Sequence, residues 1–192
     1  YGSIQIRNIA TIAGNIVTAS PIGDSLPLLL SLDASISIES FNTKTILSLK
    51  DFFISYRKTK LKKGQFISSI RIPIYKKNIF KAYKISKRID DDISSVCASF
   101  NVAIVNKKIK NIKIAYGGMA PTPKRAIHCE KILLNSDFSE EVILKAQISL
   151  ETDFQPISDM RASKNYRMEI AKNLLLKCFT EIKNNKSIRL NH

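Results

Sequence analysis

The sequence predicts an α+β fold made of two successive pieces that meet near residues 75–79. One observation is the strict alternation of polar and apolar residues over 34–40, which is the pattern of a half-buried strand. Another is the window 163–184, where the apolar positions fall on one face of a helix. Three further strand patterns follow residue 78. The second piece is therefore predicted to be a small antiparallel sheet covered by helices.

The first piece, residues 1–76, is predicted to contain few regular elements. Residues 1–15 are rich in Ile, Ala and Gly without a helical period, so we expect irregular backbone there. Asp24 or Ser25 is expected to cap a short apolar helix. The elements expected next are a strand at 34–40, its hairpin partner at 45–48, a short helix or turn at 49–56, a basic loop at 60–64 and an edge strand at 65–74. We expect no compelling core within this piece alone.

The second piece, residues 79–185, shows strand patterns followed by helical ones. A short turn at 106–108 predicts an antiparallel hairpin. Ser139 is expected to cap a helix whose first turn carries two glutamates. The expected elements are strands at 80–85, 94–105 and 109–116, a loop at 117–123, and helices at 124–135, after 139 and at 163–184. Residues 186–192 are predicted to be a frayed tail.

Composition narrows the function classes. The chain has 192 residues, 44% of them hydrophobic, which is typical of a globular protein and argues against disorder. No apolar stretch approaches the length of a membrane helix. The net charge of +15 could indicate a polyanion-binding module, but 23 Lys and only 8 Arg, scattered along the chain, favour a solvated surface. We therefore expect neither nucleic acid nor a membrane as a partner.

The cysteines argue against a metal site in this chain. Cys97, Cys129 and Cys178 are far apart, and no pair has metal-ligand or redox spacing. His128 and His192, the only histidines, complete no ligand set with them. Reduced core thiols of this kind are typical of a cytoplasmic protein, which is the location we expect. We predict no iron–sulfur or zinc site here.

The segment most informative about chemistry covers residues 7–15 and 19–24. Its small residues leave the backbone bare, so several N–H groups can approach an anion closely. Thr11 and Asn15 add hydrogen-bonding side chains, and Asp24 lies on a turn where a carboxylate can accept from sugar or polyol hydroxyls. The pattern fits a pyrophosphate site. It fits equally a turn in which small residues only pack tightly, because it is neither a Rossmann fingerprint nor a P-loop.

Six sequence segments that follow one another in a fixed order favour the pyrophosphate site over a turn that is only tightly packed. They are residues 5–24 (containing RNIATIAGN and ASPIGD), 56–59 (YRKT), 70–73 (IRIP), 84–93 (KISKRIDDDI), 116–126 (YGGMAPTPKRA) and 159–163 (DMRAS). Together they closely resemble the FAD-binding part of xanthine dehydrogenases and their molybdenum-hydroxylase relatives, and the resemblance runs to about Asn184. One departure is Ala13, where the family usually has Gly. An alanine fits there only if its φ is negative.

The resemblance implies a fold and a function. Residues 1–76 would be the C-terminal half of an FAD-binding domain of the vanillyl-alcohol-oxidase/xanthine-dehydrogenase type, and residues 79–185 the α+β domain that follows it. The chain begins at Tyr1, and we expect an upstream iron–sulfur/FAD segment that shares the cofactor, with molybdopterin in a large subunit. The implied enzyme is xanthine dehydrogenase, in which electrons from purine oxidation pass through iron–sulfur clusters and FAD to NAD. The alternatives are a flavoprotein subunit of an aldehyde- or carbon-monoxide-type hydroxylase and a basic polyanion-binding module.

The resemblance also implies individual contacts, and none of them is a catalytic acid or base. Residues expected to line the FAD pyrophosphate are Ala10, Thr11, Ala13, Gly14 and Asn15. Asp24 would bind a hydroxyl of FAD, and Ile67 would pack on the flavin or adenine unless it is plain strand core. Lys84 would lie near the flavin, where a cation stabilises the reduced ring, or else be an ordinary exposed lysine. Tyr56, Asp90 and Asp91 would gate NAD or the flavin, with core packing and a polar turn as the alternatives.

Overall fold

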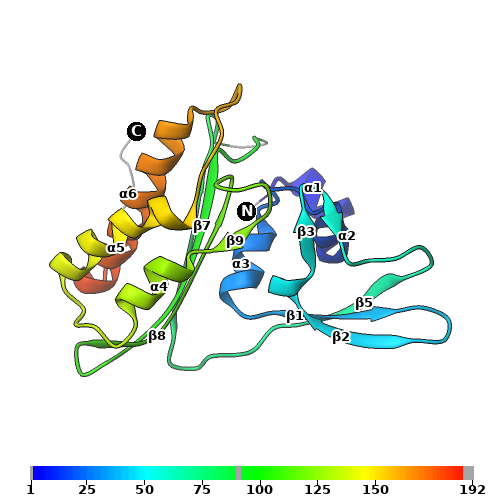
Figure 1. Ribbon diagram of the computed structural model, residues 1–192, viewed down its shortest axis with the longest axis horizontal. Helices are drawn as coiled ribbons and strands as arrows, with labels where there is room; N and C mark the ends of the chain where they lie inside the picture. The colour runs from blue at the N-terminus through cyan, green and yellow to red at the C-terminus, as the bar shows by residue number, and fades with distance from the viewer. Residues whose placement is uncertain (1, 90–91, 188–192) are drawn as a thin grey trace.

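The computed structural model describes residues 2–89 and 92–187 and confirms the α+β fold (Figure 1). The elements of the first piece are α1 (Ile4–Ile9), α2 (Ile12–Thr18), α3 (Ser25–Ser31), β1 (Ser35–Glu39), β2 (Lys44–Ser48), η1 (Leu49–Asp51), β3 (Phe53–Ser55), β4 (Lys58–Thr59) and β5 (Phe66–Arg71). Those of the second are β6 (Ile79–Ile85), β7 (Val96–Val105), β8 (Lys108–Gly117), β9 (Lys124–Arg125), α4 (Ile127–Leu133), α5 (Glu140–Asp153) and α6 (Lys164–Asn184).

Two short helices occupy the start of the chain, so the expectation of irregular backbone over residues 1–15 is wrong. Each helix begins behind a hydroxyl side chain. Ser3 Oγ accepts from the N–H of Ile6 at 3.4 Å, and Thr11 Oγ1 accepts from the N–H of Gly14 at 3.0 Å. Helix α1 buries none of its residues and α2 buries only Ile16. A helix that packs no face needs no apolar stripe, which is why the sequence shows no helical period there.

The sheet of the first piece has the strand order β2-β1-β5, and both neighbours run antiparallel to β1. The predicted hairpin is confirmed, with Ile36 opposite Leu47. Strand β5 lies at the sheet edge and ends at Arg71, just before Pro73, because proline cannot donate to a ladder. Strands β3 and β4 form a separate two-stranded ribbon after η1.

The second sheet has the order β6-β7-β8-β9, with all neighbours antiparallel. The turn between β7 and β8 has φ of 50° at Asn106 and 60° at Lys107, the conformation that suits a two-residue hairpin. The predicted helix over 124–135 is too long. Lys124 and Arg125 instead pair with β8 as β9, and helix α4 begins only at Ile127.

Strands β7 and β8 are covered on both faces. Figure 1 shows α4, α5 and α6 on one side of the sheet and α3 on the other. Phe100 and Tyr116 face the three helices, and the Tyr116 hydroxyl donates to the carbonyl of Ala171 in α6 at 2.9 Å. The alternate residues face α3: the hydroxyls of Ser99 and Ser31 lie 2.6 Å apart. Helix α3 therefore joins the two pieces.

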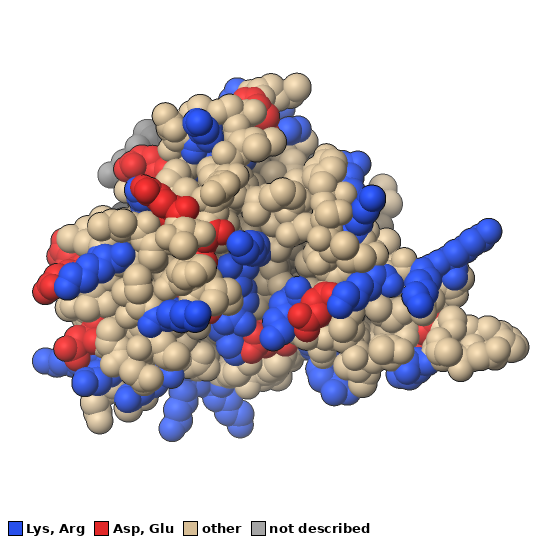
Figure 2. All heavy atoms as spheres, viewed as in Figure 1, with Lys and Arg blue, Asp and Glu red and all other residues tan. Residues whose placement is uncertain are grey.

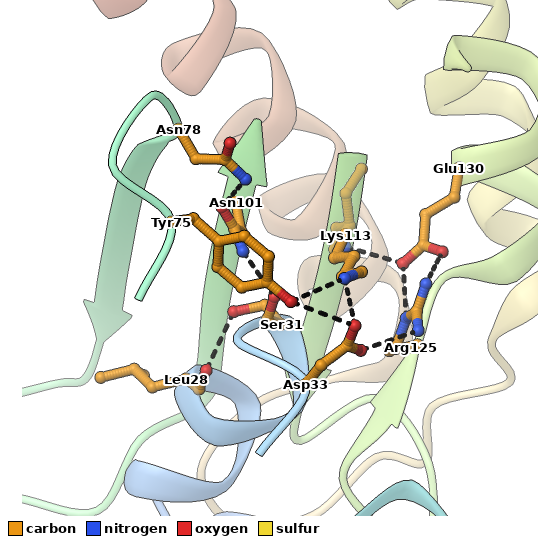
Figure 3. A network of polar contacts seen from close by, with 10 residues as sticks. Leu28, Ser31, Asp33, Tyr75, Asn78, Asn101, Lys113, Arg125 and Glu130 are labelled. Atoms are coloured by element: carbon orange, nitrogen blue, oxygen red, sulfur yellow. Dashed lines mark hydrogen bonds and ion pairs between the residues drawn. The ribbon is translucent and has the colours of Figure 1, made fainter. Parts of the chain in front are cut away.

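The first piece does have an apolar core, contrary to expectation, but the second piece closes it. Its buried members are Ile16, Leu26, Leu29, Leu30, Ala34, Ile36, Ile38, Leu49, Phe52 and, from β8, Ala115. A polar network at the end of α3 joins the pieces as well (Figure 3). There Asp33 contacts the ammonium of Lys113, and Arg125 Nη1 lies 3.4 Å from Asp33 Oδ1. Arg125 also pairs with Glu130 at 2.5 Å.

Candidate functional site

The segment over residues 10–15 lies at the surface and forms the start of α2. Ala10, Thr11 and Gly14 are exposed. A Cβ added at Gly14 would come within 2.9 Å of Thr11 Oγ1, so a side chain there would displace the hydroxyl that caps α2. Ala13 lies inside this helix, whose backbone has negative φ, and the alanine therefore fits. Asn15 Oδ1 accepts from the hydroxyl of Ser25 at 2.6 Å, which ties the segment to the start of α3.

Asp24 stands immediately before α3, but its side chain does not cap the helix. Its carboxylate instead accepts from Lys84 Nζ at 2.8 Å and from the Ser94 hydroxyl. Lys84 Nζ also donates to the carbonyl of Asp92 at 2.7 Å. The side chains of Asp24 and Lys84 are 23% and 22% exposed, so both are held in place and still open to a ligand.

The turn before Asp24 is fixed from the second piece. The N–H of Gly118 donates to the carbonyl of Pro21 at 2.8 Å. A Cβ at Gly117 would lie 3.1 Å from the same carbonyl oxygen, so the two segments touch through backbone. The predicted residues of segment 10–15, Asp24 and Lys84 thus form one connected cluster, supported by Ser25, Ser94 and Gly118. Sequence reasoning considered Ser25 only as a helix cap and missed its bond to Asn15 and the role of Ser94, because a single serine does not reveal its long-range partner.

The chemistry of this cluster suits a ligand with both an anionic and a hydroxylated part. The N–H groups of Ala10, Gly14 and Asn15 already donate to Ile6 and Thr11, so what this segment offers a diphosphate is the open approach that its small side chains leave at the start of α2. The Asp24 carboxylate accepts hydrogen bonds from hydroxyls, and the Lys84 ammonium attracts negative charge. On the face seen in Figure 2, the basic side chains are dispersed and acidic ones lie among them. No continuous basic stripe for a polyanion is visible on that face.

The remaining predicted residues lie outside this cluster. Ile67 sits on β5 opposite Ile38, half-buried against the core of the first piece. Tyr56 is 58% exposed on the turn between β3 and β4, where the Arg57 guanidinium lies 5.8 Å from its ring centroid. Asp90 and Asp91 lie outside the described residues.

Neither metal nor thiol chemistry is visible in the chain as described. Within residues 2–89 and 92–187, no group of His, Cys, Asp and Glu side chains could hold a metal ion. The three cysteines are buried, and burial raises the pKa of Cys178 to about 12, which makes it a poor nucleophile. None of the helices over the same residues has the length and apolar character needed to cross a membrane.

Comparison with known proteins identifies the family to which this chain belongs. A family model described as the CO dehydrogenase flavoprotein C-terminal domain matches residues 81–182. Another, described as the FAD binding domain in molybdopterin dehydrogenase, matches residues 1–75. The chain belongs to the flavoproteins of the molybdenum hydroxylases. The resemblance seen in the sequence motifs is thereby confirmed.

Relatives of this flavoprotein family have diverse names. The chain is 36% identical to nicotinate hydroxylase of Emericella nidulans, over 92% of this chain and 14% of the relative. It is 37% identical to xanthine dehydrogenase of the same organism, over 80% of this chain and 12% of the relative. It is 30% identical to the glyceraldehyde dehydrogenase medium chain of Sulfolobus acidocaldarius, over 94% of this chain and 64% of the relative. The chain therefore spans only part of each relative.

The fold of this flavoprotein also matches solved structures. Carbon monoxide dehydrogenase from Hydrogenophaga pseudoflava superposes with a TM-score of 0.86 at 23% identity, over 91% of this chain and 61% of that chain. This likeness concerns the fold, and it agrees with the match of both family models.

Proposed function

We propose that this flavoprotein chain supplies part of the FAD site of a xanthine dehydrogenase. In that role, electrons from purine oxidation pass through iron–sulfur clusters and FAD to NAD. The observation that carries the proposal is the convergence of the bare segment 10–15, Asp24 and Lys84 into one cluster. Residues 1–76 would contribute half of an FAD-binding domain and residues 79–185 the domain behind it. The proposed partners are an upstream iron–sulfur/FAD segment and a molybdopterin-binding large subunit, in a cytoplasmic enzyme.

The role proposed for segment 10–15 is to hold the FAD pyrophosphate. Thr11 and Asn15 shape the segment through their contacts with Gly14 and Ser25. The small side chains of the segment let its main chain approach the phosphate oxygens without steric hindrance. The residues assigned to this contact are Ala10, Thr11, Ala13, Gly14 and Asn15.

The roles proposed for Asp24 and Lys84 are complementary. When bound, FAD supplies redox chemistry that none of the protein's side chains can perform. Asp24 accepts a hydrogen bond from a hydroxyl of the cofactor while it remains paired with Lys84 at 2.8 Å. Lys84 keeps an ammonium in this part of the site, and a cation favours the electron-rich reduced ring. Ile67 is assigned to packing against the flavin or adenine. Tyr56 is assigned, together with residues 90–91, to gating the acceptor.

A hydroxylase of the aldehyde or carbon monoxide type is the second candidate. It is favoured by the glyceraldehyde dehydrogenase medium chain, because the present chain matches 64% of that relative and only 12% of the xanthine dehydrogenase. Reoxidation of the reduced intact enzyme separates the two. Rapid oxidation by NAD supports the xanthine dehydrogenase role, and oxidation only by other acceptors supports the second candidate.

The FAD assignment is tested by a pair of matched aspartates. Asp24 precedes α3 and pairs with Lys84, whereas Asp33 follows α3 and pairs with Lys113. In the intact protein, Asp24→Ala should lower FAD affinity by about tenfold or more, because a hydrogen bond to a charged group is worth about 1.5–3 kcal/mol. Asp33→Ala should retain FAD. Full flavin content with unchanged affinity in Asp24→Ala would contradict the assignment.

A further inference from the structure

Arg167 is a buried arginine whose guanidinium reaches three separate segments. It lies in the first turn of α6 and is only 2% exposed. Its Nη1 donates to the carbonyl of Ser95 and, at 3.2 Å, to the carbonyl of Gly118. Its Nη2 donates to Asp159 Oδ1 at 2.7 Å. One side chain therefore joins the start of β7, the loop after β8 and the loop before α6.

Two of these segments are the ones that hold the candidate cofactor site. Ser95 adjoins Ser94, whose hydroxyl donates to the Asp24 carboxylate. Gly118 has φ of +82° and donates its N–H to Pro21, in the turn that carries Asp24. A Cβ at Gly118 would collide with the carbonyl oxygen of Ser95 and lie 3.0 Å from Arg167 Nη1. The carbonyl of Ser95 and the guanidinium of Arg167 therefore leave no room for a side chain at position 118.

Stability alone is a weak reason to bury this group. Removing a charged guanidinium from water is unfavourable, and an apolar side chain of similar size is often as stable in such a place. Among the described residues, the Nε of Arg167 is also buried with no hydrogen-bond partner. A buried group that lacks a hydrogen-bond partner lowers stability, and natural proteins keep such departures mainly at functional sites.

We propose that Arg167 is a positioning residue for the FAD site: it fixes the backbone at Ser95 and Gly118, and through them the Asp24 carboxylate. The proposal rests on the proposed FAD-binding function and adds a residue from the second domain to it. Arg167 touches neither Asp24 nor the segment over 10–15 in any contact described above. Its effect on the cofactor passes through Ser94 on one side and through the turn at Pro21 on the other.

Arg167→Lys is the most informative substitution. Lysine retains the positive charge, but its single ammonium lacks the planar fork that lets an arginine bind two carbonyls and a carboxylate in fixed directions. We expect FAD affinity to fall by about tenfold, which corresponds to the loss of one hydrogen bond to a charged group. The matched control is Arg125→Lys. Arg125, on β9, is also largely withdrawn from solvent, with 18% of its side chain exposed, but its partners are Asp33, after the opposite end of α3, and Glu130 of α4.

The experiment reconstitutes the intact apo-protein with FAD, well below the unfolding temperature of each variant. If Arg167 acts through Asp24, Arg167→Lys should weaken FAD binding about tenfold in the wild-type background and much less in an Asp24→Ala background, because effects on a shared interaction do not add. Arg125→Lys should leave FAD affinity within about twofold. If Arg167→Lys fails to fold, Asp159→Asn loosens the same guanidinium from a partly exposed position and should show the same dependence on Asp24 with a smaller effect.

Three results overturn the positioning role. They are equal losses of FAD affinity in the two lysine variants, a loss that is unchanged in the Asp24→Ala background, and full affinity in both Arg167→Lys and Asp159→Asn. These results differ from failure of the proposed function itself. In that case the wild-type protein would bind no FAD, or Asp24→Ala would bind it as well as the wild type does, and the positioning role would fall with it.

Discussion

The ion pair between Asp33 and Lys113 should stabilise the contact between the two pieces. Asp33→Ala removes the carboxylate that Lys113 contacts and that Arg125 approaches at 3.4 Å. The pair is neither fully buried nor exposed, since the side chains of Asp33 and Lys113 are 36% and 14% exposed. Breaking a buried pair costs about 3–5 kcal/mol and losing a hydrogen bond to a charged group about 1.5–3 kcal/mol. Partial exposure favours the lower range, so we expect a loss of about 1.5–3 kcal/mol.

Urea unfolding followed by circular dichroism measures this loss as a shift of the midpoint at constant slope. Lys113→Met serves as the second arm of a double-mutant cycle. Once the lysine is gone, Asp33→Ala should have a much smaller effect, because the uncompensated ammonium is no longer present. A loss below about 0.5 kcal/mol, which is usual for surface substitutions, would refute the reasoning. So would an equal loss in both backgrounds.

The remaining predictions concern the flavin, the core and acid stability. Lys84→Met should lower the flavin midpoint potential in a redox titration and, under the proposed xanthine dehydrogenase function, slow NADH formation with the molybdenum half-reaction unchanged. Tyr116→Phe should lower the free energy of unfolding by about 0.5–1.5 kcal/mol, because one buried hydrogen bond is lost while the Ala171 carbonyl, inside α6, remains part of the helical ladder; an unchanged midpoint of thermal unfolding would contradict this. Burial raises the pKa of Asp159, but hydrogen bonds from two main-chain N–H groups and from Arg167 hold it below the ordinary 3.8. The Asp159 carboxylate therefore stabilises the fold above pH 3.8, and this contribution is lost as the pH falls through the lowered pKa. In urea unfolding at a series of acid pH values, the free energy of unfolding of Asp159→Asn should fall less steeply than that of the wild type.

Local patterns predicted those elements whose stability depends on a buried face. The alternating polar and apolar residues over 34–40 predicted β1, and the apolar face over 163–184 predicted α6. The helices over residues 4–18 escaped prediction because they are fixed by the hydroxyl caps of Ser3 and Thr11 rather than by packing. Strand β9 is only two residues long, too short to show a pattern.

Long-range partners could not be predicted from sequence. The resemblance assigned Asp24 and Lys84 to separate roles, and their 2.8 Å pairing joins residues 60 positions apart. Ala115 closes the core of the first piece from a strand of the second, so its role depends on the packing of α3 against that sheet. The burial of Arg167 could not be predicted either, because an arginine in the sequence of an amphipathic helix is normally assigned to its solvent-exposed polar face.

Hydrogen–deuterium exchange of the intact protein, with and without FAD, tests most directly whether segment 10–15, Asp24 and Lys84 form one cofactor site. Bound FAD should slow exchange in peptides that cover residues 10–15, the turn at Asp24 and the strand end at Lys84. Peptides from α5, which packs on the far side of the sheet, should exchange at the same rate in both samples. FAD-saturated protein with unchanged exchange in those three segments, or with protection confined to other regions, would contradict the site.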